Sequence, residues 1–306
     1  MNFKIMEKQT LQSTLKSADT EEWIDIVFYR PIGYQMALWA RTLHITPNQI
    51  TVTSMFIGIA AGILFYYELL WVNVIGMLLL ILANSMDSAD GQLARMTNKC
   101  TQFGRVLDGF CGDLWFISIN FMLAFRLMNE GYSIYTWIFL FLNGYLHTKQ
   151  ASLADYYRNF HLLIINKNKE FVQSKVQKEK YKILSWRKDF LNTFSVYMYG
   201  NYTFAQEKST PHLQQFYNLL RIKYVDNIPQ KLTDEFRLVS KPLMKYCNIL
   251  TFNTRVIALF VALFLGMPIL YFIFEFTVLN AILLYLWLKH ERISEHFYSK
   301  LFRNEF

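Results

Sequence analysis

Acidic residues gather in one short part of the sequence, between two strongly apolar segments. Asp87 and Asp90 are three residues apart, so on a helix they lie about 60° apart on one face. Asp108 and Asp113 follow in the next apolar segment. Carboxylates that converge near an apolar boundary repel one another and take up protons unless a cation neutralises them. Hard oxygen ligands suit Mg²⁺ or Mn²⁺, and Mg²⁺ also suits a substrate that carries a pyrophosphate. The pattern therefore predicts a divalent metal site.

Small and basic residues accompany these aspartates. Gly91 would let a nucleotide approach the backbone closely. Arg95 offers a planar guanidinium fork for a pyrophosphate. Ala94 and Gly104 would allow either close helix packing or access of a nucleotide. These residue types favour a phosphate-rich ligand beside the metal site.

Residues 87–108 resemble the signature of the CDP-alcohol phosphotransferases, membrane enzymes that move a phosphate-linked group from a CDP-activated donor to an alcohol. The family signature reads D-x2-D-G-x2-A-R-x8-G-x3-D-x3-D. Seven of its eight fixed residues are present at the right spacing, namely Asp87, Asp90, Gly91, Ala94, Arg95, Gly104 and Asp108. The eighth is displaced, because Gly112 stands in its place and the carboxylate of Asp113 comes one residue later.

The resemblance implies a role for each of these residues. Asp87, Asp90, Asp108 and Asp113 would hold Mg²⁺ or Mn²⁺, two ions by analogy with the family, and Asp113 would also accept the proton of the attacking hydroxyl. The family's P-N-x-[IL]-T element, which opens the first transmembrane helix beside the nucleotide, is matched from residue 47 to residue 51. The implied nucleotide-binding residues are Asn48, Thr51, Gly91, Ala94, Arg95 and Gly104.

The displaced aspartate poses a geometric problem. On a regular α-helix the fourth residue after Asp108 lies about 40° away, whereas the fifth lies about 140° away. A single π-type turn would bring Asp113 back under Asp108, and such turns occur often at functional sites. Gly109 and Gly112 would permit this distortion, so we expect a π-type turn here. The alternatives are a different group as base, or a protein that keeps the fold without catalysis.

Apolar segments around the aspartates predict transmembrane helices. Between Arg41 and Asp87 the only charged residue is Glu68, which leaves room for two spans of roughly 20 residues with a turn near 66–70. A third helix would begin near Gly104. Three more uncharged runs, the last two divided near Pro268, occupy residues 131–148, 256–274 and 276–288. The expected fold is an all-α integral membrane protein with six transmembrane helices.

The charge distribution predicts an orientation. The chain has 31 Lys and Arg, a net charge of +8 and 53% hydrophobic residues. If the N-terminus is cytoplasmic, nearly all the basic residues stay inside, which places the aspartates on the cytoplasmic face of a membrane, such as a bacterial inner membrane. Nucleic acid is a poor partner for this chain because the basic residues follow the membrane topology and form no single stripe.

Four regions are expected. Residues 1–45 form an N-terminal cytoplasmic segment, in which 26–43 reads as an interfacial helix and no cleavable signal peptide is visible. Residues 46–150 hold four transmembrane helices and the aspartates, and Thr46 or Asn48 can cap the first of these helices. Residues 151–247 form a cytoplasmic helical insertion, with amphipathic helices near 213–224 and 232–240. Residues 248–306 hold the last two spans and a cytoplasmic tail.

Basic residues outside the signature suggest an acceptor site. Lys149, Arg158 and Arg255 could form a pocket for a polyanionic acceptor, although membrane anchoring would explain them equally well. Glu275, within the last span, could pair with a neighbouring helix. The insertion could cover the active site, shape the acceptor pocket or lie on the membrane. The three cysteines show no paired or metal-ligand spacing.

These features predict a metal-dependent transferase of phospholipid biosynthesis. It would transfer a phosphatidyl group from CDP-diacylglycerol to a polar alcohol of inositol phosphate or glycerol phosphate type and release CMP. One alternative is transfer of a headgroup from a CDP-linked alcohol to diacylglycerol or a ceramide-like lipid. The other is a non-catalytic membrane scaffold of the same fold. By analogy with the family, the protein is expected to be a homodimer.

Overall fold

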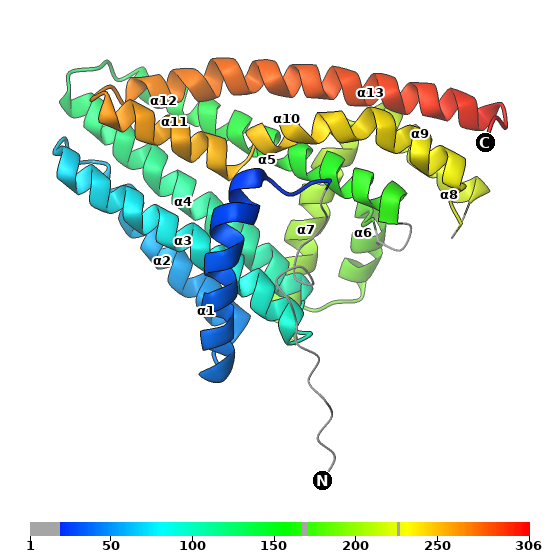
Figure 1. Ribbon diagram of the computed structural model, residues 1–306, viewed down its shortest axis with the longest axis horizontal. Coiled ribbons are helices and arrows are strands. Elements are labelled where there is room, and N and C mark those ends of the chain that lie inside the picture. The colour runs from blue at the N-terminus through cyan, green and yellow to red at the C-terminus, as the bar shows by residue number, and fades with distance from the viewer. Residues whose placement is uncertain (1–18, 167–170, 225–226) are drawn as a thin grey trace, which may run out of the picture. The chain divides into compact units, whose positions relative to one another are not determined.

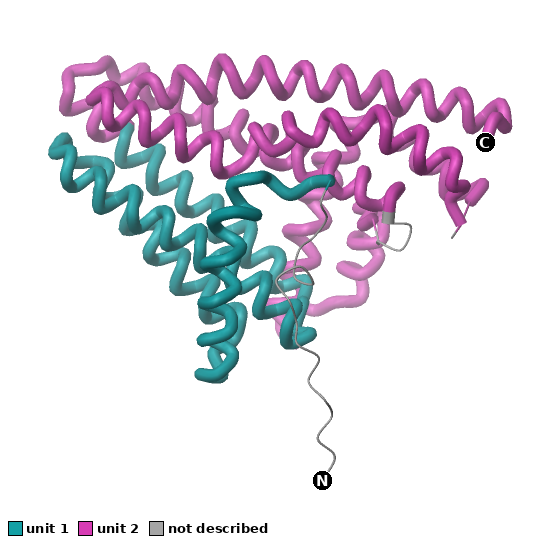
Figure 2. The backbone as a smooth tube through the Cα atoms, viewed as in Figure 1, with its two compact units in different colours: residues 1–123 teal, residues 124–306 magenta. Residues whose placement is uncertain are grey.

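The protein is all-helical throughout the residues that the structure, a computed structural model, describes, which are 19–166, 171–224 and 227–306 (Figure 1). The chain divides into two compact units, residues 1–123 and residues 124–306 (Figure 2). This division falls inside one long helix, so it differs from the boundaries at residues 45, 150 and 247 that the sequence suggests.

The first unit contains a short π-helix and the helices that carry the signature. They are η2 (Asp25–Tyr29), α1 (Arg30–Thr42), α2 (Pro47–Leu64), α3 (Leu70–Met96) and the first part of α4 (Gln102–Asn129). The start of α2 is as predicted, with Thr46 as N-cap and Pro47 in the first turn. The side chain of Gln49 completes a capping box by accepting a hydrogen bond from the backbone N–H of Thr46, at 2.8 Å.

Glycines let the helices of the first unit approach closely. A Cβ added at Gly58 of α2 would lie 2.3 Å from Trp115 of α4, and one added at Gly33 of α1 would lie 2.9 Å from Ser88 of α3. Because α1 contacts α3 at Ser88, the predicted interfacial helix packs directly on the part of α3 that carries the signature. It is also held there by Gln92, whose Nε2 donates to the carbonyl of Arg30 at 3.0 Å.

The second unit contains the insertion and the C-terminal helices. Its elements are α5 (Thr136–Asn166), α6 (Ser174–Lys182), α7 (Phe190–Ser209), α8 (Pro211–Lys223), α9 (Gln230–Ser240), η3 (Lys241–Leu243), α10 (Met244–Ile249), α11 (Phe252–Phe264), α12 (Ile269–Phe274), η4 (Glu275–Leu279) and α13 (Asn280–Phe302). The predicted helices near 213–224 and 232–240 correspond to α8 and α9. The predicted break between the last two spans lies between α11 and α12, where Gly266 has a φ of 67°.

The insertion forms a hydrophobic core with the helices on either side of it. Phe160 of α5, Phe216 of α8, Phe236 of α9 and Phe297 of α13 are all buried in one cluster. The ring centroids of Phe160 and Phe236 are 5.7 Å apart, and those of Phe236 and Phe297 are 5.4 Å apart. The C-terminal half of α13 carries Phe297 and Leu301 and forms the surface on which α8 and α9 pack.

The protein is an integral membrane protein. Five helical stretches of the described residues are long and apolar enough to cross a membrane, namely Pro47–Leu64, Leu70–Met96, Gln102–Asn129, Gln230–Phe264 and Ile269–Phe302. The span expected at 131–148 lies mostly in α5, which begins at Thr136, and it is not among these five stretches. The reason is the polar content of α5, which includes the buried side chains of Asn143, His147 and Gln150.

Candidate metal and nucleotide site

Three aspartates come together between α3 and α4. Asp87 and Asp90 of α3 and Asp108 of α4 each offer one carboxylate oxygen, and these oxygens all lie within 4.8 Å of one another. Asp90 is buried, Asp87 is half-buried and Asp108 is exposed. The cluster is therefore anchored at one end in the helix packing and open at the other. The spacing of Asp87 and Asp90 accounts for their shared helix face, and Asp108 joins them from the next helix.

Thr51 of α2 holds the buried carboxylate in place. Its hydroxyl Oγ1 lies 2.5 Å from Oδ2 of Asp90 and 3.1 Å from the carbonyl oxygen of Pro47. The side chain of Thr51 is buried. The residue expected to contact the nucleotide is thus in contact with a carboxylate of the cluster, and it joins α2 to α3 at this point.

The rotation of α4 is determined by a stripe of side chains that face α2. Trp115 donates from Nε1 to the carbonyl of Ser54 at 3.1 Å, and Ser118 donates to the carbonyl of Ile59 at 3.0 Å. Cys111 is buried, with its sulfur 3.5 Å from the carbonyl oxygen of Thr51. These positions repeat at four and three residues, which is a helical period. This period is visible in the sequence, but none of these three residues belongs to the family signature.

The same stripe decides where Asp113 lies. α4 is a continuous α-helix from Gln102 to Asn129, so the predicted π-type turn near Asp108 is wrong. On an unbroken α-helix Asp113 is about 140° from Asp108. Accordingly Asp113 is exposed and is not a member of the three-carboxylate cluster. The packing of Cys111 and Trp115 against α2 would have to break to turn it inward.

Space beside the cluster remains open at the position of the missing aspartate. A Cβ added at Gly112, or at Gly109, would meet no other atom within 4 Å. Gly112 lies about 40° from Asp108 around the helix. An aspartate at residue 112 would therefore fit on the helix face that Asp108 uses, as the family signature requires.

Arg95 lies one turn after Gly91 on α3, and its guanidinium is available for an anion. Nη1 of Arg95 would be 3.4 Å from a Cβ added at Gly91. Its Nε and Nη2 atoms are buried and have no hydrogen-bond partner among the described residues. Buried donors without partners cost free energy, which an anionic ligand would recover. Ala94, the neighbouring signature residue, is half-buried.

Asn48 and Gly104 lie beside each other at the start of α2 and the start of α4. A Cβ added at Gly104 would be 3.4 Å from Oδ1 of Asn48 and 3.1 Å from Oγ1 of Thr101. Thr101 accepts a hydrogen bond from the backbone N–H of Gly104 at 2.9 Å, so it caps α4. The six residues expected at the nucleotide lie on α2, α3 and α4, and the aspartates lie on α3 and α4. Among the six, Thr51 contacts the aspartate cluster, through Asp90.

The comparison with known proteins agrees with this arrangement. Residues 44–155 match the CDP-alcohol phosphatidyltransferase family. These residues form a CDP-alcohol phosphatidyltransferase domain. An 83-residue stretch, 27% of this chain, is 36% identical to archaetidylinositol phosphate synthase from Pyrococcus horikoshii. The chain spans 43% of the length of that curated relative, less than half of it.

The CDP-alcohol phosphatidyltransferase domain offers a set of ligands that fits a divalent cation. Three carboxylates this close together repel one another strongly in a partly buried setting unless positive charge is bound between them. All-oxygen ligands of this kind are those that Mg²⁺ and Mn²⁺ prefer. The residues that would hold an ion are Asp87, Asp90 and Asp108.

The three basic residues expected at the acceptor do not come together in the second unit. Lys149 and Arg158 are nine residues apart on the continuous helix α5, and nine residues correspond to about 180° of rotation, so they lie on opposite faces. The ammonium of Lys149 lies 5.8 Å from the ring centroid of Tyr145. Arg158 donates from Nη2 to the carbonyl of Cys247 at 3.3 Å.

Arg255 is engaged in a buried polar network. Its side chain is 1% exposed and forms an ion pair with Glu275, with 2.5 Å between Nη1 and Oε1. It also donates to Nδ1 of His147 at 2.9 Å and to Oε1 of Gln150 at 2.6 Å. Asn143 donates to the other oxygen of Glu275 at 2.7 Å. Glu275 opens the π-helix η4, so the pairing expected for this residue is present and joins α5, α11 and η4.

Proposed function

We propose that this protein transfers a phosphatidyl group from CDP-diacylglycerol to a polar alcohol of inositol phosphate or glycerol phosphate type, with release of CMP. The observation that carries the proposal is the cluster of Asp87, Asp90 and Asp108 within the family-matched segment, with oxygens within 4.8 Å of one another. The unpartnered donors of Arg95, one helical turn beyond Gly91, add a site for the pyrophosphate of the donor.

The proposed reaction is a displacement at phosphorus. The alcohol oxygen forms a bond to the β-phosphorus, the bond from that phosphorus to the oxygen bridging to CMP breaks, and CMP leaves with the electron pair. Asp87, Asp90 and Asp108 would hold Mg²⁺ or Mn²⁺, which in two-metal sites stabilises both the attacking and the leaving oxygen. Thr51 orients Asp90, while Gly91, Ala94, Gly104 and Asn48 line the nucleotide side.

Asp113 is the proposed acceptor of the alcohol's proton, by analogy with the fourth aspartate of the family signature. Of the four aspartates, Asp113 has the least favourable position for reaching the substrate, because it lies about 140° around the helix from Asp108. The proposal therefore requires a local change in α4 when substrates bind. Gly109 and Gly112 are the residues at which the backbone could adjust.

The relative supports the choice of acceptor. Its name describes the synthesis of archaetidylinositol phosphate, which favours an inositol phosphate-type acceptor for this chain too. The separate positions of Lys149, Arg158 and Arg255 leave no support for an acceptor pocket built from all three. Transfer from a CDP-linked alcohol to diacylglycerol or a ceramide-like lipid would use the same aspartates and is the second candidate.

Release of CMP tests the proposal directly. Purified protein in lipid vesicles with Mg²⁺ would receive CDP-diacylglycerol with inositol phosphate or glycerol phosphate, and separately CDP-choline or CDP-ethanolamine with diacylglycerol. We expect CMP with the first donor only, and none from the Asp90→Asn variant. Release of CMP from CDP-choline or CDP-ethanolamine alone would show that the CDP-linked alcohol is the donor and the lipid is the acceptor. Nucleotide binding without turnover from any pair would favour the non-catalytic scaffold.

The proposal extends to membrane orientation and assembly. The distribution of Lys and Arg along the chain favours a cytoplasmic active site, and analogy with the family favours a homodimer. Protection of Cys100, which is exposed between α3 and α4, from a membrane-impermeant maleimide in right-side-out vesicles would support the first point.

A further inference from the structure

Helices α6 and α7 form a hairpin whose far end is the segment 183–189 (Figure 1). The two helices pack closely, since a Cβ added at Gly200 would lie 3.1 Å from Cβ of Gln177. The base of the hairpin is tied down by a hydrogen bond from the hydroxyl of Ser174 to Glu207. Gln206 also donates to the carbonyl of Ser152 on α5 at 2.8 Å. The base of the hairpin is therefore fixed to α5.

The far end of this hairpin exposes large apolar side chains. Ile183 is 85% exposed, Phe190 59% and Leu191 54%. Beside them Trp186 donates from Nε1 to the hydroxyl of Tyr181 at 3.1 Å. The ring centroids of Trp186 and Phe190 are 5.6 Å apart. The hairpin tip, defined as residues 181–191, thus combines an apolar surface with a Trp and a Tyr that keep their polar atoms paired.

Basic residues lie along α6 and in the hairpin tip. Between residues 174 and 192 the sequence contains two acidic residues, Glu179 and Asp189, and six basic ones: Lys175, Lys178, Lys180, Lys182, Arg187 and Lys188. All six basic side chains are exposed. An apolar surface with a surplus of exposed positive charge on the same hairpin is complementary to a layer of anionic headgroups above acyl chains.

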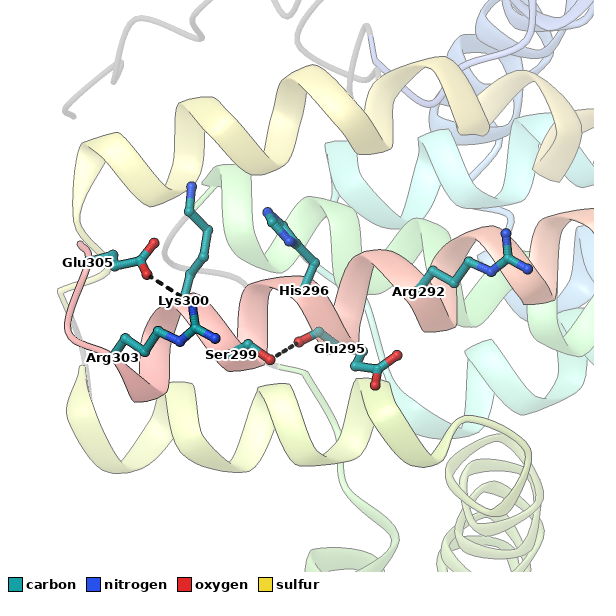
Figure 3. Close-up of a pocket in the computed structure, with 7 residues that line it drawn as sticks. All are labelled: Arg292, Glu295, His296, Ser299, Lys300, Arg303 and Glu305. Atoms are coloured by element: carbon teal, nitrogen blue, oxygen red, sulfur yellow. Dashed lines mark hydrogen bonds and ion pairs between the residues drawn. The ribbon is translucent and has the colours of Figure 1, made fainter.

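A charged cavity elsewhere in the second unit differs in composition from the hairpin tip. A cavity of about 400 Å³ near the end of α13 is lined by charged and polar side chains of both signs (Figure 3). Two of its cations already have partners, because Lys300 pairs with Glu235 at 2.6 Å and Arg303 with Glu305 at 3.9 Å. This cavity lacks the exposed apolar side chains that the hairpin tip presents.

We propose that the hairpin tip inserts into the headgroup region of an anionic bilayer, as a membrane contact additional to the transmembrane helices. Ile183, Phe190 and Leu191 enter the boundary between headgroups and acyl chains. Trp186 and Tyr181 sit at headgroup depth, where such amphipathic rings are favoured. The Lys and Arg side chains extend towards the lipid phosphates. The tip thereby anchors the insertion to the membrane.

Spin-label accessibility tests this contact. The full chain would carry Cys100→Ser, which leaves only buried native thiols, together with a label at Ile183→Cys or Leu191→Cys. A label at Lys208→Cys, an exposed site at the base of the hairpin, is the matched control. In nanodiscs that contain phosphatidylglycerol, we expect the tip labels to collide several-fold more with O₂ than with a water-soluble nickel chelate. The control label should show the reverse. Equal accessibility at tip and base would overturn the proposal.

Two further experiments test whether the contact depends on lipid charge and whether the partner is another protein molecule. Arg187→Gln with Lys188→Gln should reduce the depth of the Ile183 label in anionic nanodiscs to that in neutral phosphatidylcholine. The control pair Lys289→Gln with Arg292→Gln, two exposed positions on α13, should leave the depth unchanged. A label at residue 183 that keeps its full depth in anionic nanodiscs despite the tip substitutions contradicts an electrostatic contact. Spin–spin broadening at Ile183 that disappears on dilution with unlabelled protein would instead identify a second copy as the partner.

Discussion

The hydroxyl of Thr51 lies 2.5 Å from Oδ2 of Asp90, in a buried contact between α2 and α3. This contact connects the first helix of the family-matched segment to the carboxylate cluster. It engages one oxygen of Asp90 and leaves the carboxylate's other lone pairs for a cation. Groups that orient metal ligands in this way affect affinity without touching the metal.

Replacing Thr51 by Val should therefore weaken metal binding while the helices stay packed. We expect about 10- to 100-fold loss of Mn²⁺ affinity and of CMP release, as is common when a residue that orients a metal ligand is changed. Thr53→Val is the matched control, because Thr53 is exposed on the same helix and its hydroxyl donates to the carbonyl of Gln49, at 2.9 Å. Equal effects of the two substitutions would show that Thr51 acts only through folding.

The three clustered aspartates should each be required for the metal. Asp87→Asn, Asp90→Asn and Asp108→Asn remove charge but keep side-chain shape, so Mn²⁺ binding followed by electron paramagnetic resonance should fall in all three. CMP release should fall to background, and chelation of the metal by EDTA should have the same effect on the unmodified protein. Retained turnover in any of these variants would argue against the metal site.

Gly112 offers a test of the displaced aspartate. If Asp113 accepts the proton, Asp113→Asn should lower CMP release by about 10²- to 10⁴-fold, the usual contribution of a general base, with little change in Mn²⁺ affinity. Gly112→Asp should restore turnover in that background, because a Cβ at residue 112 meets no atom within 4 Å. Unchanged turnover in Asp113→Asn would remove this residue from the mechanism.

The ion pair of Arg255 and Glu275 should contribute to the stability of the fold more than to substrate binding. Arg255→Met leaves a carboxylate buried without its cation, which costs about 3–5 kcal/mol and should lower the thermal unfolding temperature in detergent. Arg255→Met with Glu275→Leu should recover much of the loss. As a control, Lys182→Met breaks the pair with Glu179, whose side chains are 67% and 62% exposed, and should have almost no effect. A normal unfolding temperature with weakened acceptor binding would restore the acceptor role of Arg255.

Much of the local structure was predictable because it depends on neighbours in the chain. The spacing of Asp87 and Asp90 determines their shared helix face, Thr46 and Pro47 determine where α2 begins, and Gly266 with Pro268 separates α11 from α12. The long apolar runs determined that the protein crosses a membrane. Each of these outcomes follows from short-range geometry or from the hydrophobic content of one segment.

Other outcomes depended on contacts between distant residues. The rotation of α4 is decided by Cys111, Trp115 and Ser118 against α2, and this packing overrides the expectation of a π-type turn at Asp113. The buried network around Arg255 uses residues more than a hundred positions apart in the chain, so a cation expected at the acceptor became part of the helix packing. The sequence by itself determined which residues could bind a metal and a nucleotide. Only the tertiary structure decided which side chains face one another, because helix rotation is determined by the total packing of several helices.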